Sequence, residues 1–496
     1  MSPAAPRRVV CIGCGPTVIG FTYRLNQMIK NNELSPDDIQ VTVLERYAEP
    51  GGLAGTHIDE QGFAWDLGGH VHGEPSKYEC FQKALEGLPC EWNMLRRAAK
   101  ADMRHIFNDA RNGVCETSAA GTNNEDDHSS YVPYPVQQAV PLFPSEIRQQ
   151  CIDDIRDAQQ RSYAAKPKEF DEWTDRVFGK KLKEIFVTPY NRKVWTVELS
   201  EMNAHWVGER VALVDVDKLE KLSMKTREEL LKDDLGWGPN TFFRYQKSER
   251  GSGGTWKLMV RDHPTEWYKF KHEVTNVDTG KKVVSALNAV TNESINIEYD
   301  VLITSMPITV FCGMVGVDVP RLQFSKVCLV GLGLSMPQSQ WAQETTWAYY
   351  PDPSIIFYRV TFLSNYNRCM TPDPGKFWSL LLEVGRKPNA HVDSKEIVDK
   401  CVDGIIRSGI IANASQVKHQ WYCLLPYGYP IPTVERDEEL TKAHRTLEGL
   451  NIYSRGRFGG WKYEVANMDH SFAQGFELAD RLWNGKPETV YKTGLV

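Results

Sequence analysis

The amino-acid sequence predicts an α/β protein in three parts: a parallel-sheet unit, a helical unit and a smaller antiparallel-sheet unit. Three observations support this prediction. A strand–helix–strand pattern occupies the first fifty residues, helical periodicity runs from 144 to about 231, and strand-like patterns fill 325–385. The chain has 496 residues, which exceeds the size of one compact core, so two or three packed units are expected.

The composition excludes several classes of protein. The chain is 41% hydrophobic and 25% charged, as soluble globular proteins usually are, and its net charge of -6 provides no general attraction to nucleic acid or anionic membranes. No stretch approaches the ~20 apolar residues of a membrane span. The apolar run after Arg8 ends at Gly13, which indicates a buried strand and not a signal peptide. We expect a cytoplasmic protein, monomeric or homo-oligomeric, that binds neither nucleic acid nor membranes.

The eleven cysteines are scattered and odd in number, which favours reduced thiols in a cytosolic protein. Cys11 and Cys14 have the spacing of a redox or metal-binding pair. No second pair follows at the spacing of a zinc site, so we predict no metal.

The first element is a strand at 9–12, followed by a glycine turn with Gly13 and Gly15 and by a helix from Pro16. A second strand at 41–44 ends at Glu45. Glycines in the first turn let the backbone approach a pyrophosphate, which the helix N-terminus then holds, and the acid accepts hydrogen bonds from ribose hydroxyls. The pattern therefore predicts dinucleotide binding, with an ordinary α/β turn as the alternative.

The third glycine of this fingerprint is missing. Val18 stands at its position, and we expect Gly20 to relieve the close helix–strand contact instead. Gly51 and Gly52 follow soon after the acid, and this second glycine pair is typical of FAD proteins and not of NAD dehydrogenases. The sequence favours non-covalent FAD.

The remaining elements follow from periodicity. Apolar residues at helical spacing predict helices from 144 onward, including a charge-rich helix at 218–231. The period shortens at 268–303, which predicts a small sheet, and longer antiparallel strands are expected within 325–385. A final helix follows 452, and the polar stretch 112–130 is interpreted as an insertion.

Several short strings resemble those of eukaryotic UDP-galactopyranose mutases. They occur in the family's order at 68–71, 132–135, 189–195, 208–211, 237–240, 357–366, 428–430 and 456–467. The resemblance covers about 9–480. It implies a Rossmann-like FAD-binding domain of the glutathione-reductase/amine-oxidase type, formed by 1–93, 236–310 and 434–496. It further implies a helical domain at 139–228 with UDP-binding residues, and an antiparallel sheet domain at 94–138 and 311–433.

The resemblance also implies an activity. Members of that family interconvert UDP-galactopyranose and UDP-galactofuranose, the sugar nucleotide of galactofuranose biosynthesis. N5 of reduced FAD attacks the anomeric carbon and displaces UDP, and the sugar ring opens and recloses in a flavin-iminium adduct. The reaction is redox-neutral but requires reduced flavin, for which NADPH is the expected external reductant.

The site residues implied by the resemblance match the chemistry of this substrate. Guanidinium groups fork onto phosphate oxygens, which suits Arg210 and Arg359, and phenol hydroxyls bind phosphate without adding charge. His70 is expected to support the flavin edge, and Asn240 to contact the ribityl or sugar region. The other expected substrate-binding residues are Tyr134, Gln137, Phe186, Asn191, Trp195, Tyr349, Tyr366, Tyr429 and Tyr463. The expected cofactor-binding residues are Gly13, Gly15, Thr17, Glu45, Arg46, Gly52, Leu53, Gly68, Gly69, Val274, Arg457, Asn467, Met468 and Ser471.

The chain departs from the family pattern at Val18, at 72–75 and at Val187. Three alternatives stay open at this point: a flavin oxidoreductase on the same fold, a mutase for a different UDP-sugar, and a nucleotide-sugar-binding regulator. An oxidoreductase would need an apolar tunnel or an aromatic cage in place of the paired arginines.

Overall fold

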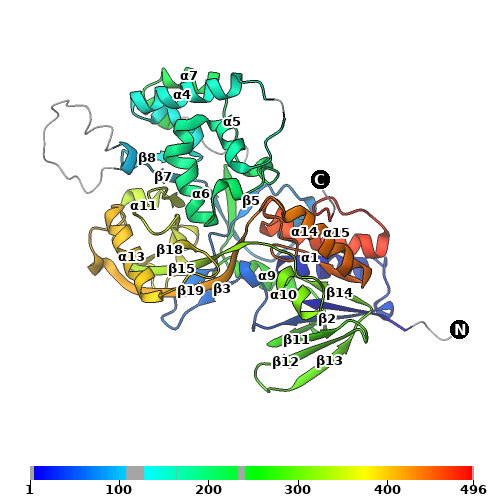
Figure 1. The fold of residues 1–496 in the computed structure, drawn as a ribbon. Helices are drawn as coiled ribbons and strands as arrows, with labels where there is room; N and C mark the ends of the chain where they lie inside the picture. Colours follow the sequence, from blue (N-terminus) through cyan, green and yellow to red (C-terminus); the bar gives the residue numbers. More distant parts are fainter. Residues whose placement is uncertain (1–4, 108–127, 164, 233–240, 494–496) are drawn as a thin grey trace.

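The computed structural model describes residues 5–107, 128–163, 165–232 and 241–493. Asn240, with its string 237–240, and most of the polar insertion at 112–130 lie outside these residues. Figure 1 shows the helical unit at the top, the parallel-sheet unit at the lower right and a larger sheet at the lower left. Among the described residues, no helix is long and apolar enough to cross a membrane, and no cluster of histidine, cysteine or acidic side chains could hold a metal ion.

A five-stranded parallel sheet confirms the strand–helix–strand prediction. Its order is β10-β2-β1-β14-β20. The strands are β10 (Tyr268–Phe270), β2 (Ile39–Glu45), β1 (Arg7–Ile12), β14 (Val301–Thr304) and β20 (Ile452–Ser454). Each paired neighbour runs parallel. The strands come from three separated parts of the chain, as the predicted discontinuous domain requires, although the exact domain boundaries stay predictions.

Two helices cross against each other beside this sheet. They are α1 (Pro16–Lys30) and α15 (Met468–Asn484). A β-carbon at Gly20 would overlap the carbonyl oxygen of Phe472, and one at Gly475 would overlap the carbonyl oxygen of Thr17. The prediction that Gly20 relieves a helix–strand contact is therefore wrong, because its close neighbour is the backbone of helix α15.

A separate three-stranded antiparallel sheet extends from the parallel-sheet unit (Figure 1). It consists of β11 (His272–Asp278), β12 (Val283–Asn288) and β13 (Ser294–Glu298). The small sheet predicted at 268–303 is thus confirmed only in its middle. Its ends, β10 and β14, belong to the parallel sheet, because the fully buried run of β14 pairs with β1 and β10 pairs with β2.

A seven-stranded sheet contains the strands predicted within 325–385. Its order is β19-β15-β18-β17-β16-β7-β8. The strands are β19 (Val417–Pro430), β15 (Phe324–Ser335), β18 (Phe377–Arg386), β17 (Arg359–Thr361), β16 (Trp347–Tyr349), β7 (Ala99–Asp102) and β8 (Tyr131–Pro133). All neighbours pair antiparallel except β16 and β7, which run parallel. Helix α13 (Ser394–Arg407) packs against this sheet.

Short strands connect the two large sheets. The hairpin β3 (Thr56–Ile58) and β4 (Ala64–Asp66) packs its aromatic rings on β15 and β19, where Gly331 leaves room for the ring of Trp65. A second small sheet has the order β5-β9-β6, formed by β5 (His72–Glu74), β9 (Phe242–Gln246) and β6 (Trp92–Arg96). The loop 67–71 between β4 and β5 is therefore held by strands at both ends.

The helical unit consists of α4 (Ser145–Gln160), α5 (Phe170–Leu182), α6 (Thr188–Trp195), α7 (Val216–Ser223) and α8 (Arg227–Lys232). The single helix predicted at 218–231 is wrong, because α7 ends at Ser223 and α8 begins anew. The Thr226 hydroxyl accepts the Glu229 amide, and the Glu229 carboxylate accepts the Thr226 amide. This reciprocal capping starts a new helix.

The helix crossing generates a stability prediction. Gly475→Ala places a methyl group into the backbone of α1 and is expected to lower the free energy of unfolding by about 1–3 kcal/mol, measured by urea unfolding followed by circular dichroism. Gly449→Ala is the control, because no atom lies within 4 Å of its added carbon. A Gly475→Ala protein as stable as the parent would show that the crossing tolerates a wider helix separation.

Candidate active site

A cavity of about 1480 Å³ lies where the parallel sheet, the loop 67–71, strand β19 and the start of α15 meet. All fourteen residues predicted to bind the cofactor line this cavity, from Gly13 to Ser471. His70, Arg210, Arg359, Tyr429 and Tyr463 line it too. Whether these residues bind a ligand stays a prediction, but the fold brings them together.

One end of the cavity is the turn between β1 and α1. Gly13 has a φ of 93°, in the left-handed region, and a β-carbon there would meet the Ser305 hydroxyl. Gly15 is the N-cap of α1, no side chain caps that helix, and its first turn holds no acidic residue. The N-terminus of α1 is thus left open to an anion, which its backbone N–H groups and dipole favour.

Glu45 lies beside this turn at the end of β2 and is buried. One carboxylate oxygen accepts the Cys14 amide at 2.7 Å and the other accepts the Tyr47 amide at 2.9 Å. Burial raises the pKa of Glu45, and these amides partly counter that effect. The carboxylate is therefore fixed at the cavity edge, with Arg46 and Val274 in the same lining.

The loop containing His70 passes close to Arg359. A β-carbon on Gly69 would lie 2.9 Å from the Thr361 hydroxyl and 3.5 Å from the Arg359 guanidinium carbon. One on Gly68, whose φ is 143°, would lie 3.1 Å from the His70 ring. Glycine at 68 leaves room for the His70 ring, and glycine at 69 lets the loop lie against Thr361 and Arg359.

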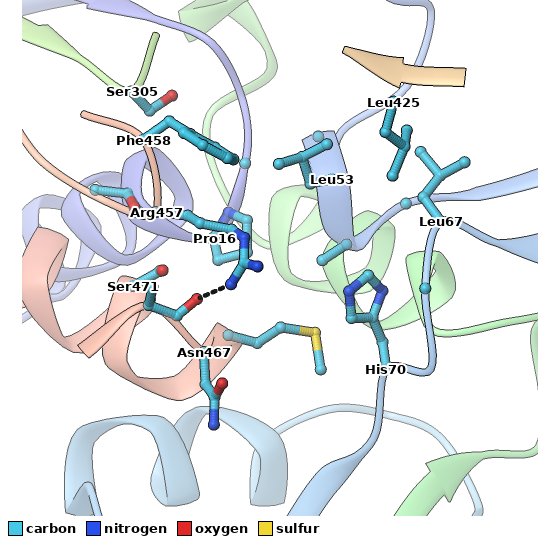
Figure 2. Close-up of a pocket in the computed structure, with 18 of the residues that line it drawn as sticks. Pro16, Leu53, Leu67, His70, Ser305, Leu425, Arg457, Phe458, Asn467 and Ser471 are labelled. Carbon is cyan, nitrogen blue, oxygen red and sulfur yellow. Dashed lines mark hydrogen bonds between the residues drawn. The ribbon is translucent and has the colours of Figure 1, made fainter. Parts of the chain in front are cut away.

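His70 and Arg457 face each other across the cavity, and Figure 2 shows both with Asn467 and Ser471 on the Arg457 side. Burial lowers the pKa of His70 to about 3, and the positive charges of Arg457 and Arg359 act in the same direction. His70 is therefore a neutral imidazole at pH 7, and its Nδ1 atom is buried without a hydrogen-bond partner.

Arg359 pairs with an acid that the sequence analysis did not select. Its Nε and Nη2 atoms donate to the two carboxylate oxygens of Glu383 at 2.7 and 2.8 Å, and the Tyr358 hydroxyl donates to the same carboxylate at 2.6 Å. Burial by itself would lower the pKa of Arg359, but Glu383 raises it well above its usual range. Register explains the pairing, since β17 and β18 place Arg359 opposite Glu383. An acid inside the apolar run 377–386 was the signal that could have revealed it.

Arg457 and Arg210 rest on backbone carbonyls. Arg457 donates to Gly428 at 2.8 Å, and its guanidinium lies 4.9 Å from the Tyr429 ring centre. Arg210 donates to the carbonyls of Glu464 and Tyr463, both at 3.0 Å. Among the side chains that the structure describes, no carboxylate lies within ion-pair distance of either guanidinium. The cavity therefore contains positive charge without a paired acid, which suits an anionic ligand.

Seven predicted substrate residues do not line the cavity. They are Tyr134, Gln137, Phe186, Asn191, Trp195, Tyr349 and Tyr366. Five belong to the aromatic packing around the site: Tyr134 stacks on Tyr349 at 4.0 Å, and Trp195 lies 4.8 Å from Tyr463. The amide nitrogens of Gln137 and Asn191 donate to backbone carbonyls of Ala212 and Val187. Asn240 lies outside the described residues.

Known proteins resemble this chain in sequence and in fold. The sequence pattern of the family described as "Flavin containing amine oxidoreductase" matches residues 32–325. A crystal structure of reduced UDP-galactopyranose mutase is similar at 30% identity with a TM-score of 0.83, and the match covers 98% of this chain and 95% of that chain.

Two oxidases share the fold at lower identity. A putative protoporphyrinogen oxidase from Exiguobacterium sp. 255-15 is 13% identical with a TM-score of 0.67, and cyclohexylamine oxidase from Brevibacterium oxydans IH-35A is 13% identical with a TM-score of 0.60. Each match covers 97% of this chain and 99% of the other. Together the comparisons confirm the predicted fold class, a FAD-binding α/β fold of the amine-oxidase type.

The neutral state of His70 predicts a pH dependence of stability. Unfolded His70 takes up a proton near pH 6.5, whereas folded His70 does so near pH 3. The stability that neutral His70 gives the folded protein is therefore fully present above pH 6.5 and is lost as the pH falls towards 3. The free energy of unfolding of the parent falls between pH 7 and pH 5. In His70→Asn this fall should be smaller by about 2 kcal/mol, as measured by urea unfolding at each pH. His391→Asn, on an exposed loop, is the control, and parallel curves for parent and His70→Asn would contradict the prediction.

Proposed function

Since this chain belongs to the family of flavin-containing amine oxidoreductases, we propose that it binds FAD non-covalently and interconverts UDP-galactopyranose and UDP-galactofuranose with the flavin reduced. The observation that carries the proposal is the group of guanidiniums at one cavity, of which Arg210 and Arg457 have no acid partner among the described side chains. A mutase structure at 30% identity over nearly the whole chain supports it.

The residues of the cavity fit FAD. The uncapped N-terminus of α1 and the left-handed Gly13 suit its pyrophosphate, and Glu45 lies where ribose hydroxyls would reach its carboxylate. Asn467 is the N-cap of α15 without a side-chain capping bond, so a second helix N-terminus opens onto the cavity beside Met468 and Ser471. The first turn of α15 also carries Asp469, so we expect the backbone amides of this end, and not a net positive charge, to bind the cofactor.

The substrate phosphates determine what the arginines would do. A UDP-sugar carries two phosphate charges that leave with UDP when the bond to the anomeric carbon breaks. Arg359 is aligned by Glu383, and Arg210 by two carbonyls, so both guanidiniums are oriented before the ligand arrives. Oriented donors stabilise the departing diphosphate without reorganisation during the reaction.

The aromatic residues would exclude water and position the sugar nucleotide. Tyr429 and Tyr463 line the cavity and are backed by Trp195, whose ring centre lies 5.7 Å from Tyr429 and 4.8 Å from Tyr463. Burial raises the pKa of Tyr429, so its hydroxyl stays protonated and can donate a hydrogen bond to phosphate. Reduced FAD, when bound, supplies the nucleophile for the anomeric carbon. Because His70 is neutral, it would not protonate that nucleophile.

An oxidoreductase on the same fold is the second candidate, because the two oxidases above share the fold at TM-scores of 0.60–0.67. Those identities of 13% support the fold and not the reaction. Arg210 and Arg457 have no acid partner among the described side chains, which argues against an apolar amine substrate, since such a ligand would leave both charges without a counter-charge. We further propose NADPH as the reductant and a cytoplasmic location.

The central experiment is anaerobic incubation of the dithionite-reduced protein with UDP-galactofuranose, followed by chromatography of the nucleotide sugars. We expect conversion to UDP-galactopyranose that disappears when the flavin stays oxidised. Steady substrate-dependent consumption of oxygen or NADPH would instead indicate the oxidoreductase. Bound, reducible flavin without conversion would contradict the galactose assignment, and a panel of other UDP-sugars would then show whether a different sugar is the substrate.

Arg210 offers a direct test of the phosphate role. Arg210→Ala removes a guanidinium but leaves no unpaired carboxylate among the described side chains, so folding and FAD content should be retained. We expect kcat/KM for the UDP-sugar to fall by about 100-fold or more. Arg192→Ala is the control, because Arg192 forms an exposed ion pair with Glu198 in the same helical unit. A fall of less than threefold in kcat/KM for Arg210→Ala would show that Arg210 does not bind the substrate phosphates.

A further inference from the structure

The short turn η12 (Tyr463–Val465) carries a row of carbonyl groups beside the cavity. The carbonyls of Tyr463 and Glu464 accept hydrogen bonds from Arg210. The next carbonyl, of Val465, accepts the Gln474 amide at 2.6 Å, and the Ala466 carbonyl accepts Arg457 at 3.4 Å. Four consecutive carbonyls are thus engaged by side chains from other parts of the chain. The position of this turn therefore sets the position of the Arg210 guanidinium.

The turn is also held by an ion pair whose arginine is buried. Arg436, the first residue of α14 (Arg436–Gly449), donates from Nη1 and Nη2 to the two carboxylate oxygens of Glu464 at 2.8 and 2.7 Å. The side chain of Arg436 is only 1% exposed. Arg436 does not line the cavity, whereas Glu464 does. A two-point contact of this kind fixes the direction of the carboxylate as well as its distance.

Glu464 consequently connects two arginines with different surroundings. Its side chain is fixed by Arg436, and its main-chain carbonyl holds Nε of Arg210. A carbonyl is a neutral acceptor, so it orients Arg210 without cancelling its charge. A carboxylate in the same place would orient the guanidinium equally well but would compete with an anionic ligand.

We propose that Arg436 and Glu464 are positioning residues for the nucleotide-sugar subsite, which act by fixing the turn η12 whose carbonyls hold the Arg210 guanidinium towards the cavity. This inference rests on the proposed function, because it assigns Arg210 to the phosphates of UDP. It adds that the affinity for those phosphates depends on an ion pair whose arginine lies outside the cavity. If the pair merely stabilised the fold, its loss would affect all properties of the protein alike.

A double-mutant cycle with UDP as the probe tests the inference. Glu464→Gln weakens one side of the two-point contact, and Arg436 keeps Asp437 as an ion-pair partner at 2.9 Å, so folding should survive. We expect the Kd for UDP, measured by calorimetry on the FAD-loaded protein, to rise about tenfold, which corresponds to about 1.4 kcal/mol. In an Arg210→Ala background the same substitution should change the Kd by less than twofold, because neighbouring residues that act together are not additive. An equal effect in both backgrounds would overturn the proposal.

A matched control is available in the same part of the chain. Glu488 accepts two hydrogen bonds from buried Arg455, at 2.7 and 2.8 Å, as Glu464 does from Arg436. Neither residue contacts Arg210 or lines the cavity. Glu488→Gln should leave the Kd for UDP within twofold of the parent. If Glu488→Gln raised the Kd for UDP as much as Glu464→Gln does, the effect would come from a general loss of stability, and the proposal would be overturned.

A second measurement does not depend on UDP. Trypsin cleaves after arginine, so cleavage between Arg210 and Val211 under native conditions, followed by mass spectrometry, reports how firmly Arg210 is held. We expect Glu464→Gln to speed this cleavage about tenfold relative to the parent and to Glu488→Gln. If the parent fails to bind UDP, the proposed function is lost and cleavage alone decides the positioning role: faster cleavage supports it, and an unchanged rate overturns it.

Discussion

Positive charge in a partly buried cavity is the constraint on which this site depends. Removing a guanidinium from water costs free energy unless hydrogen bonds replace its hydration. The chain meets this cost in two ways. Glu383 pairs with Arg359, whereas carbonyl oxygens accept from Arg457 and Arg210. Carbonyls accept hydrogen bonds from the N–H groups but do not neutralise the positive charge. An incoming anion is therefore attracted more strongly than it would be if a carboxylate paired with the guanidinium.

The fold supplies these carbonyls where secondary structure ends. Gly428 lies near the end of β19, and the turn η12 precedes α15. A carbonyl oxygen has two lone pairs, so the Tyr463 carbonyl accepts both the Ala466 amide and Arg210. The close crossing of α1 and α15 contributes as well, because it directs the N-termini of both helices towards one cavity. Backbone groups thus provide both the acceptors for the arginines and the donors for a ligand.

The sequence predicted those parts of the fold and the site in which neighbouring residues must be of a particular type. The glycine turn, Glu45 and the Gly68–Gly69 pair were visible because each demands a residue type at a fixed spacing. Glu383 was missed because its role arises from strand register, 24 positions from Arg359. The pairing of Arg436 with Glu464 was missed because it joins the start of a helix to a turn 28 positions away, which no local pattern indicates. Strands β10 and β14 were assigned to the wrong sheet, because a short apolar run does not reveal its partner, and the break between α7 and α8 depends on capping by Thr226 and Glu229.

The departure from the family pattern at 72–75 has a physical explanation in strand β9. Glu74 pairs with Arg244, which lies opposite His72 in the β5–β9 register. His72 is buried beside Trp92 and Trp256 and lies 3.2 Å from the Thr255 hydroxyl. Burial lowers its pKa to about 4, so it packs as a neutral ring. These contacts fix β5 directly after the loop that carries His70. The placement of His70 against the cavity therefore depends on an ion pair and an aromatic pocket outside the motif that identified it, and the substitutions at 72–75 have partners on β9 and α9 (Gly253–Arg261) that accommodate them.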